Sequence, residues 1–159
     1  MISFSIVATP TPQARARRGW TRDGRPITHK LTSQQRAEDV LRALLEPYRP
    51  AVPLSGPLRL LVRIYLPIPA SWSRKKQVEA MSGKTKHTSR PDLDNLLKQI
   101  KDCLSPWKDR RGVKHPGFWV DDRLVYEYLP GTGKYYDDGR GPRWEIEIIE
   151  LSPGKPEKD

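Results

Sequence analysis

Cysteine, histidine and long apolar runs are scarce in this chain. Its 159 residues include 1 Cys and 3 His, which excludes an intrachain disulfide and a cysteine-rich zinc module. No apolar run reaches the roughly 18–20 residues that a membrane-spanning helix needs. Residues 1–10 lack the basic segment of a signal peptide, and their apolar pattern predicts a short strand. These features predict a soluble, intracellular protein with no membrane partner.

Positive charge, by contrast, is abundant and unevenly placed. The chain has 29 Lys and Arg against 19 Asp and Glu, a formal net charge of +10. The excess lies in a first basic block (residues 15–30) and a second basic block (residues 71–90), each with six basic side chains and one acidic one. Concentrated cationic blocks indicate a polyanion, and a nucleic-acid backbone is its commonest form.

The positive charge is also compatible with a membrane surface or with no partner at all. An acidic membrane surface fits less well, because neither block predicts an amphipathic helix with a bulky apolar face. The blocks can also be solvated loops without a partner. If DNA is the partner, the expected contacts are Arg15, Arg17, Arg18, Arg22 and Arg25 in the first block and Arg74, Lys75, Lys76, Lys84, Lys86 and Arg90 in the second.

Hydrophobic periodicity predicts strands and helices in mixed order. Strands are expected at residues 2–8, 58–67, 118–120, 124–129 and 144–151, and helices at 32–48, 71–81 and 93–104. This order predicts an α+β fold, in which two to three helices pack on a mixed sheet and the last strands form a meander. A single small domain is expected over residues 1–151, followed by a disordered tail at 152–159.

Three connecting segments lack apolar periodicity. Residues 11–30 are expected to form a long loop or loose ribbon, and residues 81–90 are expected to be mobile. Residues 105–117 contain several Pro and Gly and four cations, which predicts a basic loop. Trp107 within that loop is interpreted as its anchor rather than as a residue that stacks on bases.

Two acidic pairs stand out from basic or apolar surroundings. Asp92 and Asp94 follow the second basic block, and Asp121 and Asp122 follow an apolar aromatic stretch. Carboxylate oxygens are ligands that Mg²⁺ prefers, and bound Mg²⁺ activates water and neutralises charge that develops on a phosphate. Acids beside a cationic surface therefore favour a metal-dependent phosphodiesterase, provided that the two segments meet in space.

Helix geometry restricts how these residues can act together. Residues two apart diverge on a helix, so Asp92 and Asp94 converge only if one of them is extended or caps the helix. Pro91 favours extended backbone before it and leaves Asp92 where an N-cap falls. Asp94, Lys98 and Asp102 recur every four residues and share one side of the helix. A lysine beside a phosphate can stabilise the charge of the transition state.

Each acidic pair also suits a structural role. Asp92 and Asp94 can cap the helix and complement its dipole. Lys98 can form ordinary surface ion pairs with the acids four residues away on either side. Asp121 and Asp122 can form a polar turn between two strands. The residues alone leave both interpretations open.

Three motifs occur in order along the second half of the chain. They are Arg90-Pro91-Asp92-Leu93-Asp94-Asn95-Leu96-Leu97-Lys98, then Asp102-Cys103-Leu104, then Val120-Asp121-Asp122. Together they resemble the RusA family of Holliday-junction resolvases, small endonucleases of bacteria and phages that cut four-way DNA junctions. The match is strongest over residues 88–129. The chain departs from the pattern in residues 105–117, which are longer and more basic.

The resemblance implies a site and a reaction. It implies an α+β homodimer that hydrolyses phosphodiester bonds with Mg²⁺, or with Mn²⁺ in its place, and cuts the junction symmetrically. Asp92, Asp94 and Asp122 become metal ligands, and Asp121 is the alternative to Asp122. Lys98 becomes the catalytic lysine.

Supporting residues follow from the same resemblance. Asn95 and Asp102 become supporting polar residues, and Lys134 becomes a further DNA contact. The implied location is the cytoplasm of a bacterial or phage-infected cell, at the nucleoid. Two alternatives remain, a basic DNA-binding module without catalysis and a metal-dependent nuclease of broader specificity.

Overall fold

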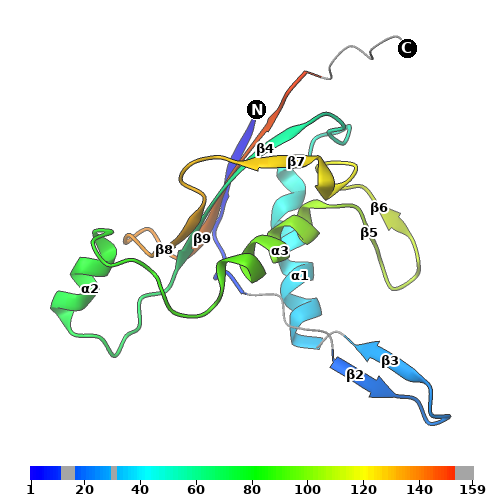
Figure 1. Cartoon of the computed structure of the whole chain (residues 1–159), viewed down its shortest axis with the longest axis horizontal. Coiled ribbons are helices and arrows are strands. Elements are labelled where there is room, and N and C mark those ends of the chain that lie inside the picture. Colours follow the sequence, from blue (N-terminus) through cyan, green and yellow to red (C-terminus); the bar gives the residue numbers. More distant parts are fainter. Residues whose placement is uncertain (12–16, 30–31, 153–159) are drawn as a thin grey trace.

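A mixed sheet of five strands forms the centre of the fold (Figure 1). Its strands are β1 (Ile2–Ile6), β4 (Leu58–Leu66), β7 (Val125–Tyr128), β8 (Gly133–Tyr136) and β9 (Arg143–Glu150). The order is β1-β9-β4-β7, and β8 also pairs with β4. β9 runs antiparallel to both of its neighbours, whereas β7 and β8 run parallel to β4. The computed structural model describes residues 1–11, 17–29 and 32–152.

β7 and β8 follow one another along a single edge of β4. Residues 58–60 of β4 face β7, and residues 63–66 face β8. The predicted meander is therefore wrong, because these two strands share a partner and run in the same direction. The strand predicted at residues 118–120 is also wrong, since Trp119 makes only an isolated bridge with Leu54.

Two helices bury one face of this sheet. α1 (Thr32–Leu45), which continues into the 3-10 turn η1 (Glu46–Tyr48), packs against α3 (Leu93–Leu104). Leu96, Ile100 and Leu104 of α3 have no exposed surface and share one core cluster with alternate side chains of β4. An apolar stripe at helical spacing thus packs on a period-two strand face. The α+β prediction is confirmed.

Smaller elements project from this core. They are α2 (Arg74–Met81), the hairpin of β2 (Arg17–Trp20) with β3 (Pro26–His29), and the hairpin of β5 (Trp107–Lys108) with β6 (Lys114–His115). The predicted short basic helix is confirmed as α2. Its N-cap, Ser73, accepts a hydrogen bond from the Lys76 amide at 3.3 Å. The predicted loops at residues 11–30 and 105–117 contain these hairpins, whose strands are too short for a periodic signal.

The segment between α2 and α3 packs on β8. His87 is 9% exposed, and its ring lies 4.5 Å from the ring of Tyr136. His87 thus joins the middle of residues 81–90, the segment expected to be mobile, to β8. The predicted tail beyond residue 152 lies outside the described residues. No helix in the described part of the chain is long and apolar enough to cross a membrane.

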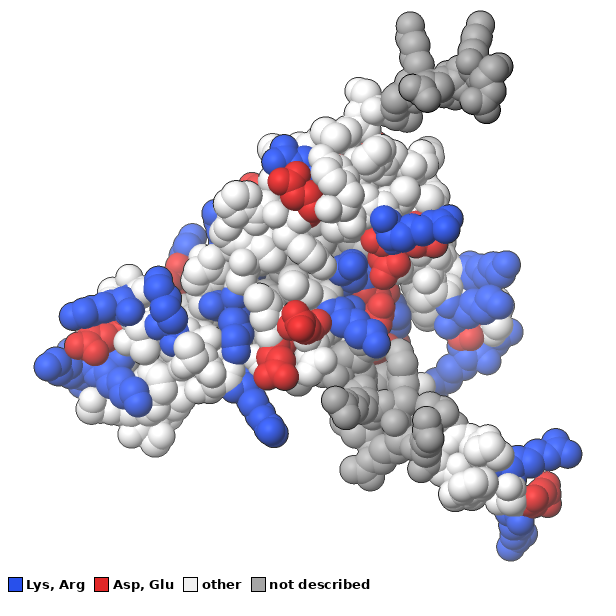
Figure 2. All heavy atoms as spheres, in the orientation of Figure 1, with Lys and Arg blue, Asp and Glu red and all other residues white. Residues whose placement is uncertain are grey.

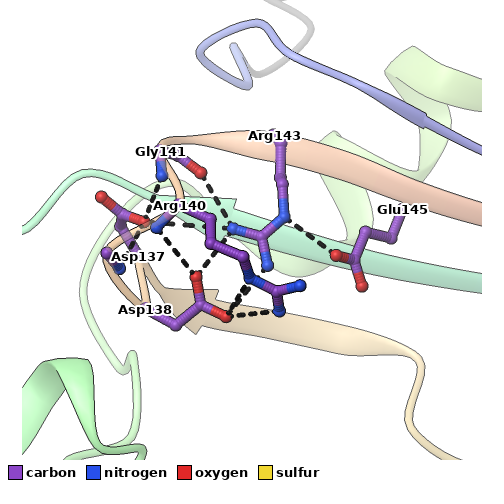
Figure 3. Close-up of polar contacts among 7 residues, drawn as sticks. Asp137, Asp138, Arg140, Gly141, Arg143 and Glu145 are labelled. Atoms are coloured by element: carbon purple, nitrogen blue, oxygen red, sulfur yellow. Dashed lines mark hydrogen bonds and ion pairs between the residues drawn. The ribbon is translucent and has the colours of Figure 1, made fainter.

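Arg143 is the buried charge that joins β8 to β9 (Figure 3). Its side chain is 4% exposed, and its guanidinium pairs with Asp138 at 2.9 Å and with Glu145 at 2.9 Å. It also lies 3.8 Å from the centre of the Tyr65 ring. Hydrogen bonds from Arg143, and secondly from Arg140, hold the pKa of Asp138 well below its ordinary value. This network holds the turn that brings β9 back along β4.

Replacing Arg143 with Met is expected to lower the free energy of unfolding by about 2–4 kcal/mol, because Asp138 and Glu145 lose their buried partner. The matched control is Arg140→Gln, which removes an exposed partner of the same Asp138 and is expected to cost much less. Denaturant unfolding of both variants measures the difference, and equal losses would contradict the role given to Arg143.

The loss in free energy of unfolding caused by Arg143→Met is also expected to depend on pH. A depressed carboxyl pKa stabilises the fold above the unfolded value of about 3.9, and this contribution is lost as the pH falls through the folded value. The gap between wild type and variant is therefore expected to narrow below about pH 4. If the stability difference between wild type and variant stays constant down to pH 2, the ion pair with Asp138 is not its cause.

Candidate active site

The first turn of α3 presents two carboxylates to solvent. Asp92 is the N-cap, with extended backbone, and its carbonyl accepts the Leu96 amide at 3.2 Å. Its carboxylate makes no capping hydrogen bond, and both Asp92 and Asp94 are exposed. The capping interpretation therefore fails for the Asp92 side chain, although the residue stands at the cap position. Its carboxylate is left available for another partner.

A shallow pocket joins α3 to the acidic turn before β7. This acidic pocket has a volume of about 240 Å³ and is lined by Asp94, Leu97, Lys98, Lys101, Asp102, Asp122 and Tyr128. Asp94 and Asp102 come from α3, whereas Asp122 opens the 3-10 turn η2 (Asp122–Leu124). The structure thus brings together three of the predicted acidic residues from two separate segments. Asp92 and Asn95 do not line this pocket.

The two adjacent acids at η2 have different surroundings. Asp121 is the N-cap of η2, and its Oδ1 accepts a hydrogen bond from the Arg123 amide at 2.9 Å. Its other oxygen lies 3.6 Å from the Arg123 guanidinium. Asp122 instead faces the acidic pocket. The turn interpretation therefore fits Asp121, and Asp122 is the member of the pair that lines the pocket.

Three charged groups of the acidic pocket have no partner among the described residues. Within the described part of the chain, Asp94, Asp122 and Lys98 make neither ion pairs nor side-chain hydrogen bonds. The surface ion pair predicted between Asp94 and Lys98 is thus not formed. Charged groups without internal partners can exchange their bound water for an incoming phosphate or cation at lower cost.

Lys134 holds the chain that leads into α3. From β8, its ammonium donates hydrogen bonds to the carbonyls of Ser89 and Pro91, the latter at 2.9 Å. These carbonyls directly precede Asp92, and the peptide bond between Arg90 and Pro91 is cis. The DNA contact that the resemblance implies for Lys134 stays a prediction; in the structure its ammonium bonds to the backbone. Its effect on the site is to position the start of α3.

The carboxylates do not form a closed metal cage. In the described ranges, no group of three His, Cys, Asp or Glu side chains is placed to hold a metal ion. Mg²⁺ is nonetheless often bound by one or two carboxylates together with waters and substrate phosphates. Asp94 and Asp122 are hard oxygen donors facing one pocket, and no His or Cys lines it. This donor set fits Mg²⁺ or Mn²⁺ better than zinc.

Basic side chains flank the acidic ones on the same face (Figure 2). Acidic side chains gather over the middle, and Lys and Arg gather over α2 at one end and over the β5–β6 hairpin at the other. The α2 end belongs to the second basic block, whose predicted DNA contacts Arg74, Lys75, Lys76, Lys84, Lys86 and Arg90 are all exposed. The Lys76 ammonium lies 3.9 Å from the Trp72 ring centre.

The first basic block is described only in part. Arg22 and Arg25 are exposed where β2 turns into β3. Arg17 and Arg18 lie on β2, opposite His29 and Thr28 of β3. Arg15 lies outside the described residues.

Two residues of the acidic pocket were not predicted. Lys101 lies one turn after Lys98, and its ammonium is 5.9 Å from the ring centre of Tyr128 on β7. Helical spacing of three residues from Lys98 was a signal for Lys101. Tyr128 carried no such signal, because its position depends on how β7 pairs with β4.

Comparison with known proteins points to one family. Residues 9–149 match the family model described as "Endodeoxyribonuclease RusA". The chain is also 28% identical over 153 residues to "Uncharacterized protein YqaN" of Bacillus subtilis (strain 168), covering 95% of this chain and 97% of that protein. The family match includes α3, the acid pair before β7 and both basic blocks. The resemblance inferred from the motifs is confirmed.

Replacing Lys134 with Met is expected to loosen the start of α3. Two hydrogen bonds from a charged donor are lost, each worth about 1.5–3 kcal/mol, so the Leu96 amide should exchange about tenfold faster or more. Lys84→Met removes an exposed cation of the second basic block and serves as the matched control. Hydrogen exchange followed by NMR measures both, and unchanged exchange in Lys134→Met would contradict the positioning role.

Proposed function

Because the chain belongs to the RusA endodeoxyribonuclease family, we propose that it is a Mg²⁺-dependent endonuclease that resolves four-way DNA junctions. The observation that carries this proposal is the acidic pocket, where Asp94, Asp102 and Asp122 meet Lys98 between two basic surfaces. A binding module has no need of exposed acids at the centre of a DNA-binding face, since they repel phosphate. A nuclease needs them, because a cation can bridge carboxylate to phosphate.

Asp94 and Asp122 are the proposed metal ligands. Both face the acidic pocket, and neither is committed to a partner in the described structure. Asp92 is the third proposed ligand, because its carboxylate is exposed at the N-cap position, two residues before Asp94, and does not cap α3. When bound, Mg²⁺ or Mn²⁺ supplies charge neutralisation at the phosphate and lowers the pKa of a water.

Lys98 is proposed to hold the phosphate that is cut. It lies one helical turn after Asp94, lines the same pocket and makes no ion pair within the described residues. An ammonium aimed at a phosphate stabilises the additional negative charge of the pentacoordinate transition state. The Lys101 ammonium lies one turn further along and adds to the same positive potential.

The proposed substrate has two-fold symmetry. Paired cuts in a four-way junction require two active sites, and the acidic pocket supplies one per chain. A homodimer is therefore proposed, with each protomer cutting one strand. Most contacts to the DNA are expected to be made by the two basic blocks to phosphates, which orient the DNA without reading its sequence.

A binding module without catalysis is the second candidate. It is favoured by one observation, that no three-carboxylate group in the described ranges is ready to hold a metal. Both candidates bind DNA with strong salt dependence, so affinity does not separate them. Cleavage in the presence of a divalent cation does.

The test is cleavage of a synthetic four-way junction by Asp94→Asn and Asp122→Asn. Each change keeps side-chain size and removes a ligand charge, so the rate with Mg²⁺ should fall at least about 100-fold. Junction binding should persist or tighten, because one repulsive charge is gone. Asp121→Asn is the matched control and should cut at nearly the wild-type rate, since Asp121 caps η2.

Three results would count against the proposal. Wild-type protein that leaves junctions uncut in Mg²⁺ and in Mn²⁺ would favour the binding module. Cutting that continues in EDTA would show that the reaction does not need a divalent cation. Equal cutting of linear duplex would support the broader nuclease.

A further inference from the structure

We propose that the β5–β6 hairpin is a second DNA-backbone surface, which holds branched DNA on the side of the acidic pocket opposite α2. This inference rests on the proposed function and adds to it a surface that the two basic blocks do not include. The hairpin surface consists of Lys108, Arg110, Arg111 and Lys114, all exposed. It accounts for the cations of residues 105–117, which the acidic pocket does not use.

The single carboxylate of the hairpin is occupied by the hairpin itself. One oxygen of Asp109 accepts the amides of Arg111 at 2.8 Å and Val113 at 3.0 Å. The other oxygen lies 2.9 Å from Nε2 of His115. The bond with His115 is the main cause that holds the pKa of Asp109 below its ordinary value. The four cations are therefore displayed with no neighbouring acid of the hairpin free to neutralise them.

A ring contact and a hydrogen bond dock this hairpin on α1. The Trp107 ring stacks on His115 at 4.3 Å between centres, and the Arg42 guanidinium of α1 lies 4.7 Å from the centre of the same ring. At the tip, Arg110 donates to the Gln35 side chain at 3.3 Å, and Gly112 has a φ of 79° that suits the turn. A docked hairpin loses little conformational entropy on binding, which favours phosphate contacts by its cations. Trp107 thus anchors the loop, as expected.

The α1 surface that faces the hairpin does not suit DNA. A groove of about 810 Å³ separates the hairpin from α1; Glu38, Asp39 and Glu46 line its α1 wall, whereas Lys108, Arg110 and Arg111 line its hairpin wall. Glu46 pairs with Arg49 at 2.8 Å and Glu38 lies 3.6 Å from Arg42, so this wall offers little net positive charge. A polyanion is repelled by Asp39 and gains little from cations that are already paired. The cations of the hairpin, rather than those of α1, are therefore the ones that we propose contact DNA.

The position of the hairpin relative to α3 supports one continuous DNA path. β5 begins shortly after the C-terminus of α3, whereas α2 and the loop after it precede its N-terminus. The 12 residues of α3 span about 18 Å, and duplex DNA carries one charge per about 1.7 Å of its axis. Figure 2 shows both groups of cations on the face that carries the acids between them. DNA lying across the acidic pocket can therefore meet cations on both sides of the cut.

The test removes two hairpin charges and compares their effect with two charges removed elsewhere. Arg111→Gln/Lys114→Gln changes the hairpin surface, and Lys155→Gln/Lys158→Gln removes the same charge from the C-terminal tail. Neither pair contains a residue of the acidic pocket. Binding of the full-length proteins to a four-way junction is measured between 50 and 300 mM KCl. The slope of log K against log salt should become shallower by about 1–2 for the hairpin variant.

The control variant should keep nearly the wild-type slope. Equal changes in both variants would show a bulk charge effect, and a wild-type slope in the hairpin variant would remove the hairpin from the interface; either result overturns the inference. Cleavage is measured separately at saturating protein. If the wild-type protein does not cleave the junction, the proposed function is refuted. The salt dependence of junction binding would still decide whether the hairpin contacts DNA.

Crosslinking tests directly whether the hairpin lies beside the bound DNA. Val113 is 52% exposed at the hairpin, and Cys103 is buried, so Val113→Cys places one accessible thiol beside the cations. A photoactivatable group on that thiol should crosslink to the bound junction, whereas wild type treated in the same way should not. No crosslink to DNA that is demonstrably bound would contradict the inference.

Discussion

The packing of α3 on the sheet is the constraint on which the rest of this structure depends. Leu96, Ile100 and Leu104 are fully buried in the shared core, so the rotation of α3 about its axis is settled by the exclusion of apolar surface from water. Once that rotation is set, Asp94, Lys98 and Asp102 have to lie along the exposed edge. The chemistry of the acidic pocket therefore follows from the hydrophobic side of the same helix. A Leu→Ala change in this stripe would disturb the charged side as well as the core.

Two further contacts complete the arrangement from distant parts of the chain. The Asp121 cap settles η2 so that Asp122 turns toward α3, and Lys134 on β8 holds the chain just before Asp92. Each contact uses one charged residue to place another. Like charges at the centre of the face are costly to bring together, and flanking cations offset that cost in the free protein and also attract the phosphate backbone. The charges that are proposed to bind DNA and those that are proposed to act on it are thus arranged by the same elements.

Local sequence pattern was enough to predict the elements whose signal lies in neighbouring residues. The apolar stripe predicted α3, a helix was expected at residues 71–81 where α2 lies, and the order of elements predicted an α+β fold. The motifs from Arg90 to Asp122 placed the chain in its family. The signals for the helices lie within one helix each, where periodicity and capping act, whereas the family signal is the order of three short motifs along the chain.

Contacts between residues far apart in the sequence could not be predicted from that local pattern. β8 was missed because it pairs with β4 in parallel through a long-range contact, and its aromatic residues border turn-forming glycines. Asp121 and Asp122 are equivalent in sequence and are distinguished only by which one caps η2. Lys134 reaches carbonyls 45 and 43 residues away, and no local rule indicates such a partner. Tyr128 enters the acidic pocket for the same long-range reason as β8.

The central claim is that the acidic pocket on α3 is where a DNA phosphate meets a metal ion. Its most direct test is an anomalous difference map from crystals of the protein bound to a non-cleavable four-way junction in Mn²⁺. The account predicts a manganese peak in the pocket, in contact with Asp94 or Asp122 and with a DNA phosphate. A pocket that contains DNA but no manganese, or a peak bound elsewhere with the phosphate, would contradict it.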